Sequence, residues 1–91
     1  MEVVHNTEKH RFELTFDDGV AFLEYEQRGD RMVLVHTEVP AAFEGRGCGG
    51  MLVRAAVNYA RAHQLRVVPA CPFARAYLQR HPEQVAGVEV A

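Results

Sequence analysis

Residues 36–56 of this chain read HTEVPAAFEGRGCGGMLVRAA, and their middle part places four glycines around the start of an amphipathic segment. The span from Gly45 to Gly50 satisfies the pattern G-x-G-x-x-G. Glycines that open a helix let an anion approach the backbone, and the free N–H groups and the dipole of the first turn attract negative charge. Close packing of the helix on a sheet is the alternative role, but four glycines within six residues exceed what packing requires. The stretch therefore favours a phosphate-binding loop.

The residues before this loop alternate between apolar and polar side chains, as half-buried strands do. The pattern predicts strands over 10–16, 20–28 and 32–39, and the third of these is the most apolar. Turn signals lie between them, with Asp-Asp-Gly at 17–19 and Arg-Gly-Asp-Arg at 28–31. Three strands joined by such short turns predict an antiparallel meander.

The residues after the loop change to a helical period. We expect a helix over 48–63 that buries one stripe, made up of Met51, Leu52, Ala55, Ala56, Tyr59, Ala60 and His63. A short β-branched strand over 65–69 follows, and then a second helix over 72–81 that Pro82 ends. The tail predicts a last short strand near 88–90, through two valines. Because the first helix connects the third and fourth strands, these strands should be parallel neighbours.

Size and composition are those of an ordinary globular protein. The 91 residues have room for one core, so we expect a single domain over 1–91. Hydrophobic residues make up 48% and charged residues 24% of the chain. No apolar run has the length of a membrane span, and the first residues lack the apolar segment of a signal peptide. The expected location is the cytoplasm, with no membrane partner.

Charge and residue spacing exclude three further classes of site. The net charge is −2 with acids and bases interspersed, so nucleic acid is not an expected partner. Lys9 is the only lysine, which excludes a Walker A loop because that motif needs a lysine directly after its glycines. No metal site is predicted, because zinc-ligand spacing is lacking among Cys48, Cys71, His63 and His81.

A dinucleotide-binding site is excluded by the surroundings of the glycines, although the pattern matches. A Rossmann unit places its glycines at the end of a first parallel strand and an acidic residue about 20 residues later. Here the preceding strand closes an antiparallel meander, five residues separate it from Gly45, and 65–71 contains no Asp or Glu. A chain of 91 residues is also too short for a doubly wound sheet. The glycines are therefore expected to hold another phosphate.

The glycine loop and its flanks resemble those of the GNAT superfamily of N-acetyltransferases. The superfamily's acyl-coenzyme A loop, written Q/R-x-x-G-x-G/A, is similar to EGRGCG at 44–49. The flanking segments VHTEVP and VVPACPFARAYLQRHPE are similar to those of minimal, single-domain GNAT-like proteins, and the resemblance covers about residues 10–83. It implies an α/β (α+β) fold with a three-strand antiparallel meander, a glycine loop, a helix, a parallel strand and a short helix.

The resemblance also implies a ligand and an activity. Such proteins bind acetyl-coenzyme A (acetyl-CoA) and transfer its acetyl group to a primary amine, here of a small molecule or a protein. The pantetheine arm would lie along Thr37 and Val39, and the pyrophosphate on Gly45, Arg46, Gly47, Cys48, Gly49 and Gly50. Glu44 stands where the superfamily has Gln or Arg, so we expect its carboxylate to point away from the phosphates. A monomer or a weak homodimer is expected.

The same resemblance assigns catalytic roles to three side chains. His36 and Cys71 match the proposed catalytic pair of the minimal group, with His36 as base and Cys71 as proton donor to the leaving thiolate or as transient acyl acceptor. Tyr77 roughly matches the tyrosine that many GNAT enzymes use as general acid. Glu38 is a further candidate, acting through water. A structural alternative stays open for each of the three. For His36 it is a strand histidine bonded to a backbone carbonyl, and for Cys71 it is a small apolar core residue. For Tyr77 it is a packing stripe formed with Phe73 and His81.

Two other classes of function fit the same residues. One is a module that binds CoA or acyl-CoA without catalysis. The other is a small interaction protein whose glycines serve only packing. Binding of CoA separates the interaction protein from the enzyme and the binding module. Release of a thiol from acetyl-CoA then separates the enzyme from the binding module.

Overall fold

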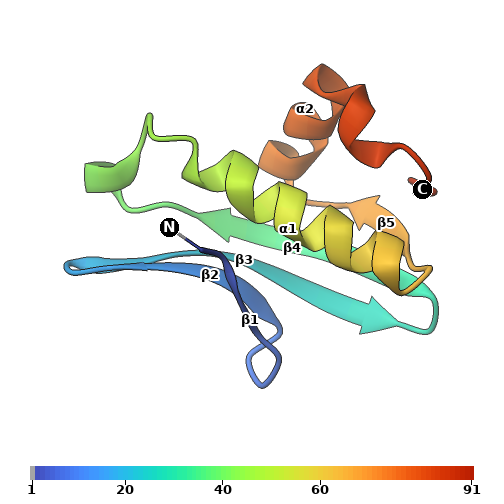
Figure 1. Ribbon diagram of the computed structural model, residues 1–91, viewed down its shortest axis with the longest axis horizontal. Coiled ribbons are helices and arrows are strands. Elements are labelled where there is room, and N and C mark those ends of the chain that lie inside the picture. The colour runs from blue at the N-terminus through green and yellow to red at the C-terminus, as the bar shows by residue number, and fades with distance from the viewer. Residues whose placement is uncertain (1) are drawn as a thin grey trace.

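The computed structural model describes residues 2–91 and contains one five-stranded sheet and two helices (Figure 1). In chain order the elements are β1 (Val4–Asn6), β2 (Arg11–Phe16), β3 (Gly19–Arg28), β4 (Arg31–Glu38), α1 (Cys48–Ala62), β5 (Arg66–Pro69) and α2 (Pro72–Arg80). Two short 3-10 turns are η1 (Ala41–Phe43) and η2 (Pro82–Val85). The helices pack against each other and both contact β4 and β5, so they lie on one face of the sheet.

The strands lie in the sheet in the same order as in the chain, β1-β2-β3-β4-β5. The first four pair antiparallel, and β4 and β5, which α1 connects, pair in parallel. These pairings confirm the predicted α/β class, the meander and the parallel neighbours. β1 is an additional strand that the sequence pattern does not predict, because three residues are too few to show alternation.

The end of the chain differs from its prediction. In place of a last strand, the structure has an isolated parallel bridge between Val90 and Val67. Pro82 opens η2, and Gly87 then turns the chain with a φ of 76°. After these turns the segment reaches β5 through the two backbone hydrogen bonds around Val67, with the carbonyl of Glu89 and the amide of Ala91.

α1 buries a face that is wider than a single stripe. Its fully buried side chains include Leu52, Val53, Ala56, Val57 and Ala60. Val53 and Val57 were outside the predicted stripe, but α1 contacts α2 as well as four strands, so more of its surface is covered. The predicted stripe is also wrong at its end, because His63 is the C-cap of α1 and is exposed. The core therefore lies between the sheet and α1, and α2 completes one side.

The opposite face of the sheet is mainly charged. Arg11 forms an ion pair of 2.6 Å with Glu13, and its guanidinium lies 4.3 Å from the centre of the Phe22 ring. The Phe22 ring in turn meets the ring of His36 edge-on, with centres 6.0 Å apart. We call this side of the sheet the charged face; its side chains include Arg11, Glu13, Phe22, Glu24, His36 and Glu38.

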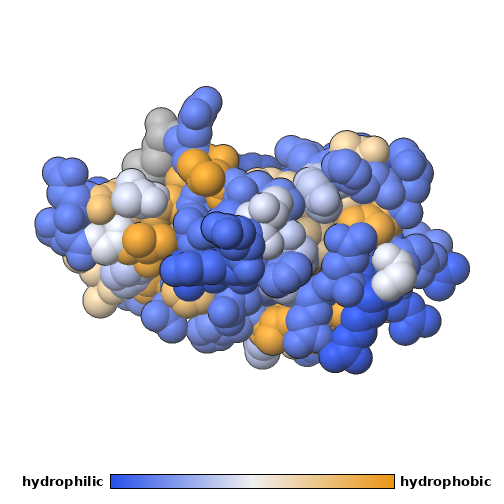
Figure 2. Space-filling view, turned by 90° about the horizontal axis from the view of Figure 1, so that it is seen from below, coloured by the Kyte–Doolittle hydropathy of each residue, from blue (hydrophilic) through white to orange (hydrophobic). Residues whose placement is uncertain are grey.

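The outer surface carries little continuous apolar area on the side seen in Figure 2. That side is mostly hydrophilic, and its hydrophobic side chains lie in small separate patches. Among residues 2–91, neither helix has the length and apolar character that crossing a membrane requires.

Candidate functional site

The parallel pairing of β4 and β5 ends well before β4 does. The last paired residues are Leu34 and Pro69, whereas β4 continues to Glu38. The amide of Cys71 donates the next hydrogen bond, 2.8 Å long, to the carbonyl of Leu34, and the chain then enters α2. β5 therefore ends beside Leu34, and within the described chain the β5-facing edge of β4 has no strand partner beyond that residue. We call this space the strand gap.

A bulge interrupts β4 where it leaves β5. Leu34 pairs with Tyr25 and His36 pairs with Glu24, so Val35 is the extra residue between them. A bulge of this kind shifts the alternation of side chains by one position. The strand residues after the bulge therefore point to faces opposite to those that a regular strand would give them.

As a result, His36 and Thr37 lie on opposite faces of the sheet. Thr37 pairs with the fully buried Leu23, and its hydroxyl oxygen lies 3.4 Å from Sγ of Cys71 on the helix side. His36 lies on the charged face, 51% exposed, and its Nε2 is 3.2 Å from a carboxylate oxygen of Glu38. The structure thus brings Cys71 to Thr37, whereas the sheet separates the side chains of His36 and Cys71.

Cys71 is a buried thiol at the N-terminus of α2. It is the N-cap residue of the helix and is 3% exposed. Burial raises the pKa of the thiol, but the Thr37 hydroxyl, which contacts Sγ, and the nearby backbone N–H groups of Ala74, Phe73 and Thr37 outweigh burial and hold the pKa of Cys71 below its ordinary value. The positive end of the helix dipole favours the thiolate as well. The structure therefore supplies an acidic thiol beside the strand gap.

We expect the Thr37→Val substitution to raise the pKa of Cys71. It removes the hydroxyl that contributes most to stabilising the thiolate. Thiolate absorbance titrated in a Cys48→Ala background should then show a midpoint at higher pH. The exposed Thr15 on β2 offers a matched control, because Thr15→Val should leave the midpoint where it is. A Thr37→Val midpoint equal to that of the parent would contradict the hydrogen bond.

The lowered pKa of Cys71 also links stability to pH. The thiol is more acidic in the folded chain than in the unfolded chain, so the thiolate stabilises the fold. This contribution is fully present above the pKa of the unfolded thiol, and it is lost as the pH falls through the folded pKa. Thr37→Val should reduce this pH-dependent part of the free energy of unfolding.

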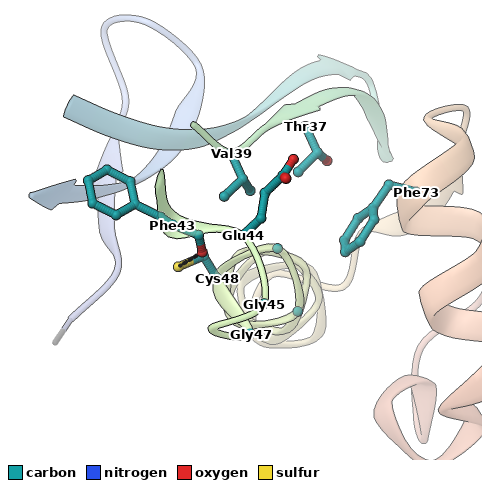
Figure 3. A pocket seen from close by; sticks show the side chains of 10 residues that line it. Thr37, Val39, Phe43, Glu44, Gly45, Gly47, Cys48 and Phe73 are labelled. Atoms are coloured by element: carbon teal, nitrogen blue, oxygen red, sulfur yellow. Dashed lines mark hydrogen bonds between the residues drawn. The ribbon is translucent and has the colours of Figure 1, made fainter. Parts of the chain in front are cut away.

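The glycine loop and the start of α1 line a cavity of about 310 Å³ next to the strand gap (Figure 3). We call it the glycine cavity; besides glycines it is lined by Thr37, Val39, Phe43, Glu44, Cys48 and Phe73. No side chain of residues 2–91 caps the first turn of α1, so the N–H groups of that turn remain available to a ligand. Cys48 offers only its backbone, because its buried Sγ contacts the carbonyl oxygen of Phe43 at 3.8 Å.

The four glycines of the loop serve two purposes. Gly45 and Gly47 have φ angles of 82° and 77°, in the left-handed region that other residues disfavour. Gly49 and Gly50 instead let α2 approach α1, because a Cβ at these positions would lie 2.5 and 2.8 Å from aromatic rings of α2. Packing, the alternative role considered for the glycines, therefore accounts for the last two, and the turn of the chain accounts for the first two.

Phe43 anchors the connection that carries the glycine loop. Its ring is 7% exposed and stacks on the ring of Phe16, with centres 3.9 Å apart. The next residue, Glu44, has an extended backbone and lines the glycine cavity. In Figure 3 its carboxylate extends toward Thr37 of β4 rather than toward Gly47 at the start of α1. The carboxylate thus lies inside the cavity but away from the first-turn N–H groups.

A second cavity, of about 430 Å³, lies between α1 and α2. We call it the basic groove after its basic side chains, which are Arg46, Arg54, Arg80 and His81. Arg46, expected beside the pyrophosphate, lines this groove and not the glycine cavity. Tyr77 lines the groove too, and its hydroxyl oxygen accepts a hydrogen bond of 2.7 Å from Arg54. The sequence pattern missed Arg54 and Arg80, because they converge from two helices and no local spacing connects them.

Comparison with known proteins places the chain in a family. The family model for the GCN5-related N-acetyl-transferase matches residues 11–88. The chain belongs to this family. Relatives named Protein NATD1 from Gallus gallus, Mus musculus and Homo sapiens are 32% identical to this chain over 85 residues. That region is 90% of this chain and 77%, 77% and 75% of the three relatives. The resemblance to the GNAT superfamily is thus confirmed.

As a GCN5-related N-acetyltransferase family member, the chain is an acetyltransferase-like protein. Its glycine cavity, strand gap and basic groove adjoin one another on the helix side of the sheet, and His36 lies on the other side. Residues 2–91 contain no group of three or more His, Cys, Asp and Glu side chains arranged as metal ligands.

Proposed function

We propose that the chain binds acetyl-CoA and transfers its acetyl group to a primary amine of a small molecule or a protein. The observation that carries this proposal is the glycine cavity, which adjoins the free edge of β4 in the strand gap. A cavity with unpaired helix N–H groups at one end and an unpaired strand edge at the other suits a ligand with a phosphate end and an amide-containing arm. Coenzyme A has both.

The parts of acetyl-CoA are assigned to the cavity as follows. The backbone from Gly45 to Gly50 binds the pyrophosphate through N–H groups of the loop and of the first turn of α1. The pantetheine arm lies along β4, where Thr37 and Val39 form the wall and the strand edge offers N–H and C=O groups. This arrangement leads the thioester to the strand gap, close to Cys71, which Thr37 contacts.

In the proposed reaction the base and the acid act from opposite faces of the sheet. His36 takes a proton from the amine, which approaches over the charged face and attacks the thioester carbonyl in the strand gap. Glu38, whose carboxylate oxygen lies 3.2 Å from Nε2, orients the imidazole ring. A C–N bond forms, the C–S bond breaks, and Cys71 donates its proton to the departing thiolate from the helix side. Proton exchange with bulk water then removes the proton from His36 and returns one to Cys71, which restores both groups.

The lowered pKa of Cys71 fits the role of proton donor, because it brings the acidity of the thiol nearer to neutral pH. Tyr77 is the second candidate for this role. Its hydroxyl already accepts a hydrogen bond from Arg54 and lies at the basic groove, so its first role is to hold the groove wall. In an alternative form of the proposal, Cys71 accepts the acetyl group transiently. This form predicts that the chain becomes acetylated when acetyl-CoA is present without an amine.

Two measurements test the proposal in sequence. Coenzyme A at about 100 times its Kd should stabilise the fold by about 2.7 kcal/mol, seen as a rise in Tm, whereas NAD and ATP should not. Release of free thiol from acetyl-CoA is then followed across a panel of primary amines, with acetylated products identified by mass spectrometry. No stabilisation by CoA would overturn the proposal. Stabilisation without thiol release for any amine would instead favour a binding module without catalysis.

A further inference from the structure

The basic groove concentrates positive charge on a chain whose net charge is −2. Arg46 comes from the glycine loop, Arg54 from α1, and Arg80 and His81 from the end of α2. The lining includes no Asp or Glu, and in the described part of the chain none of the three arginines forms an ion pair. His81 does pair, with Glu83 at 3.4 Å. The guanidinium of Arg46 lies 5.7 Å from the centre of the Phe43 ring, a contact with the ring face that leaves its N–H groups free. The three guanidinium groups are therefore available to an anionic ligand.

One of these guanidinium groups is held in place by the protein. Arg54 donates a hydrogen bond of 2.7 Å to the hydroxyl oxygen of Tyr77. The ring of Tyr77 is 7% exposed and lies on that of His81, with centres 4.4 Å apart. Because a guanidinium has five N–H donors, this bond fixes Arg54 and leaves most of its donors free. A fixed guanidinium loses little side-chain entropy when it binds an anion.

The basic groove is continuous with the glycine cavity. Gly47, Gly50 and Phe73 line both of them. A ligand with a diphosphate on the glycine loop can therefore send one arm into the glycine cavity and the other into the basic groove. The first arm meets apolar and backbone groups, whereas the second meets three arginines.

We propose that the basic groove binds the 3′-phosphate of acetyl-CoA, an inference that rests on the proposed function of the glycine cavity. The pyrophosphate is a diester that backbone N–H groups can bind, but a phosphate monoester carries nearly two negative charges at neutral pH. Guanidinium groups bind such a phosphate through paired, charge-assisted hydrogen bonds. The groove thus selects acyl-CoA over thioesters that lack the 3′-phosphate.

Titration calorimetry of the unaltered chain at low salt compares coenzyme A with 3′-dephospho-coenzyme A. We expect the ligand without the 3′-phosphate to bind at least about tenfold more weakly, and the difference to shrink as salt is added. Equal affinities would overturn the inference while leaving the proposed function in place. Failure of both ligands to bind would overturn both.

A variant locates the effect in the groove. Arg80 is exposed at the end of α2, so Arg80→Ala should fold, as its Tm reports. The substitution should lower the affinity for coenzyme A about tenfold and leave the affinity for 3′-dephospho-coenzyme A unchanged. Arg31→Ala is the matched control, because it removes the same positive charge from an exposed position at the start of β4. It should change neither of the two affinities. An equal loss for both ligands in Arg80→Ala would refute the assignment.

Discussion

The His36→Gln variant is expected to lose about 10²- to 10⁴-fold in kcat for acetyl transfer and to bind coenzyme A as well as the parent chain does. The loss follows from removing the proposed base, since glutamine keeps the size of the side chain but cannot take a proton. The unchanged binding follows from the bulge at Val35, which points His36 to the charged face and away from the glycine cavity. Turnover and calorimetric binding measured on one preparation separate the two effects.

His63→Gln is the matched control for this experiment. His63 is also exposed, but it lies at the end of α1 and lines neither the glycine cavity nor the basic groove. Its replacement should leave both kcat and binding unchanged. If His36→Gln folds and turns over at the parent rate, His36 has no part in the mechanism. The acceptor amine would then have to lose its proton to another group.

Phe43→Ala is expected to cost about 3 kcal/mol in the free energy of unfolding and to lower Tm by more than about 10 °C. Phe43 is nearly fully buried against Phe16, so its removal leaves a cavity that the η1 turn cannot fill. Because Phe43 holds the connection to the glycine loop, affinity for coenzyme A should fall as well. Urea unfolding with and without ligand measures both changes.

The control for Phe43 is the second phenylalanine of the glycine cavity. Phe73 is 41% exposed, so Phe73→Ala removes much less buried surface. We expect it to shift the unfolding midpoint little and to weaken coenzyme A binding by loss of contact alone. A Phe43→Ala chain as stable as Phe73→Ala would show that the ring stack does not anchor the loop.

The order of elements could be predicted from the sequence because each element has a local signal. Alternation marks β2, β3 and most of β4, the glycines mark the start of α1, and prolines mark both ends of α2. β1 has no such signal, because its three residues show no period. The buried face of α1 was predicted too narrow, since Val53 and Val57 are buried by tertiary contacts that the helical period does not reveal.

The site could be predicted only where one short segment contains it. The position of the glycine cavity follows from the loop itself, and the place of Cys71 at the N-cap of α2 follows from the proline after it, whereas the catalytic role of Cys71 stays a prediction. The bulge could not be predicted, because Leu-Val-His at 34–36 reads as ordinary strand and the extra residue shows only against β3. The basic groove likewise depends on how two helices pack, and its arginines are scattered along the chain.

The order of the strands has a consequence for how the chain folds. Every strand pair in the sheet except β4 with β5 joins neighbours connected by a turn, so most pairings form between nearby segments and should form early. The pairing of β5 with β4 spans the whole of α1, so we expect it to form after the antiparallel pairings. Acetyl-CoA is proposed to enter beside this strand pair. Ligand contacts made there are absent from an early transition state, so we expect a bound ligand to slow unfolding far more than it speeds folding.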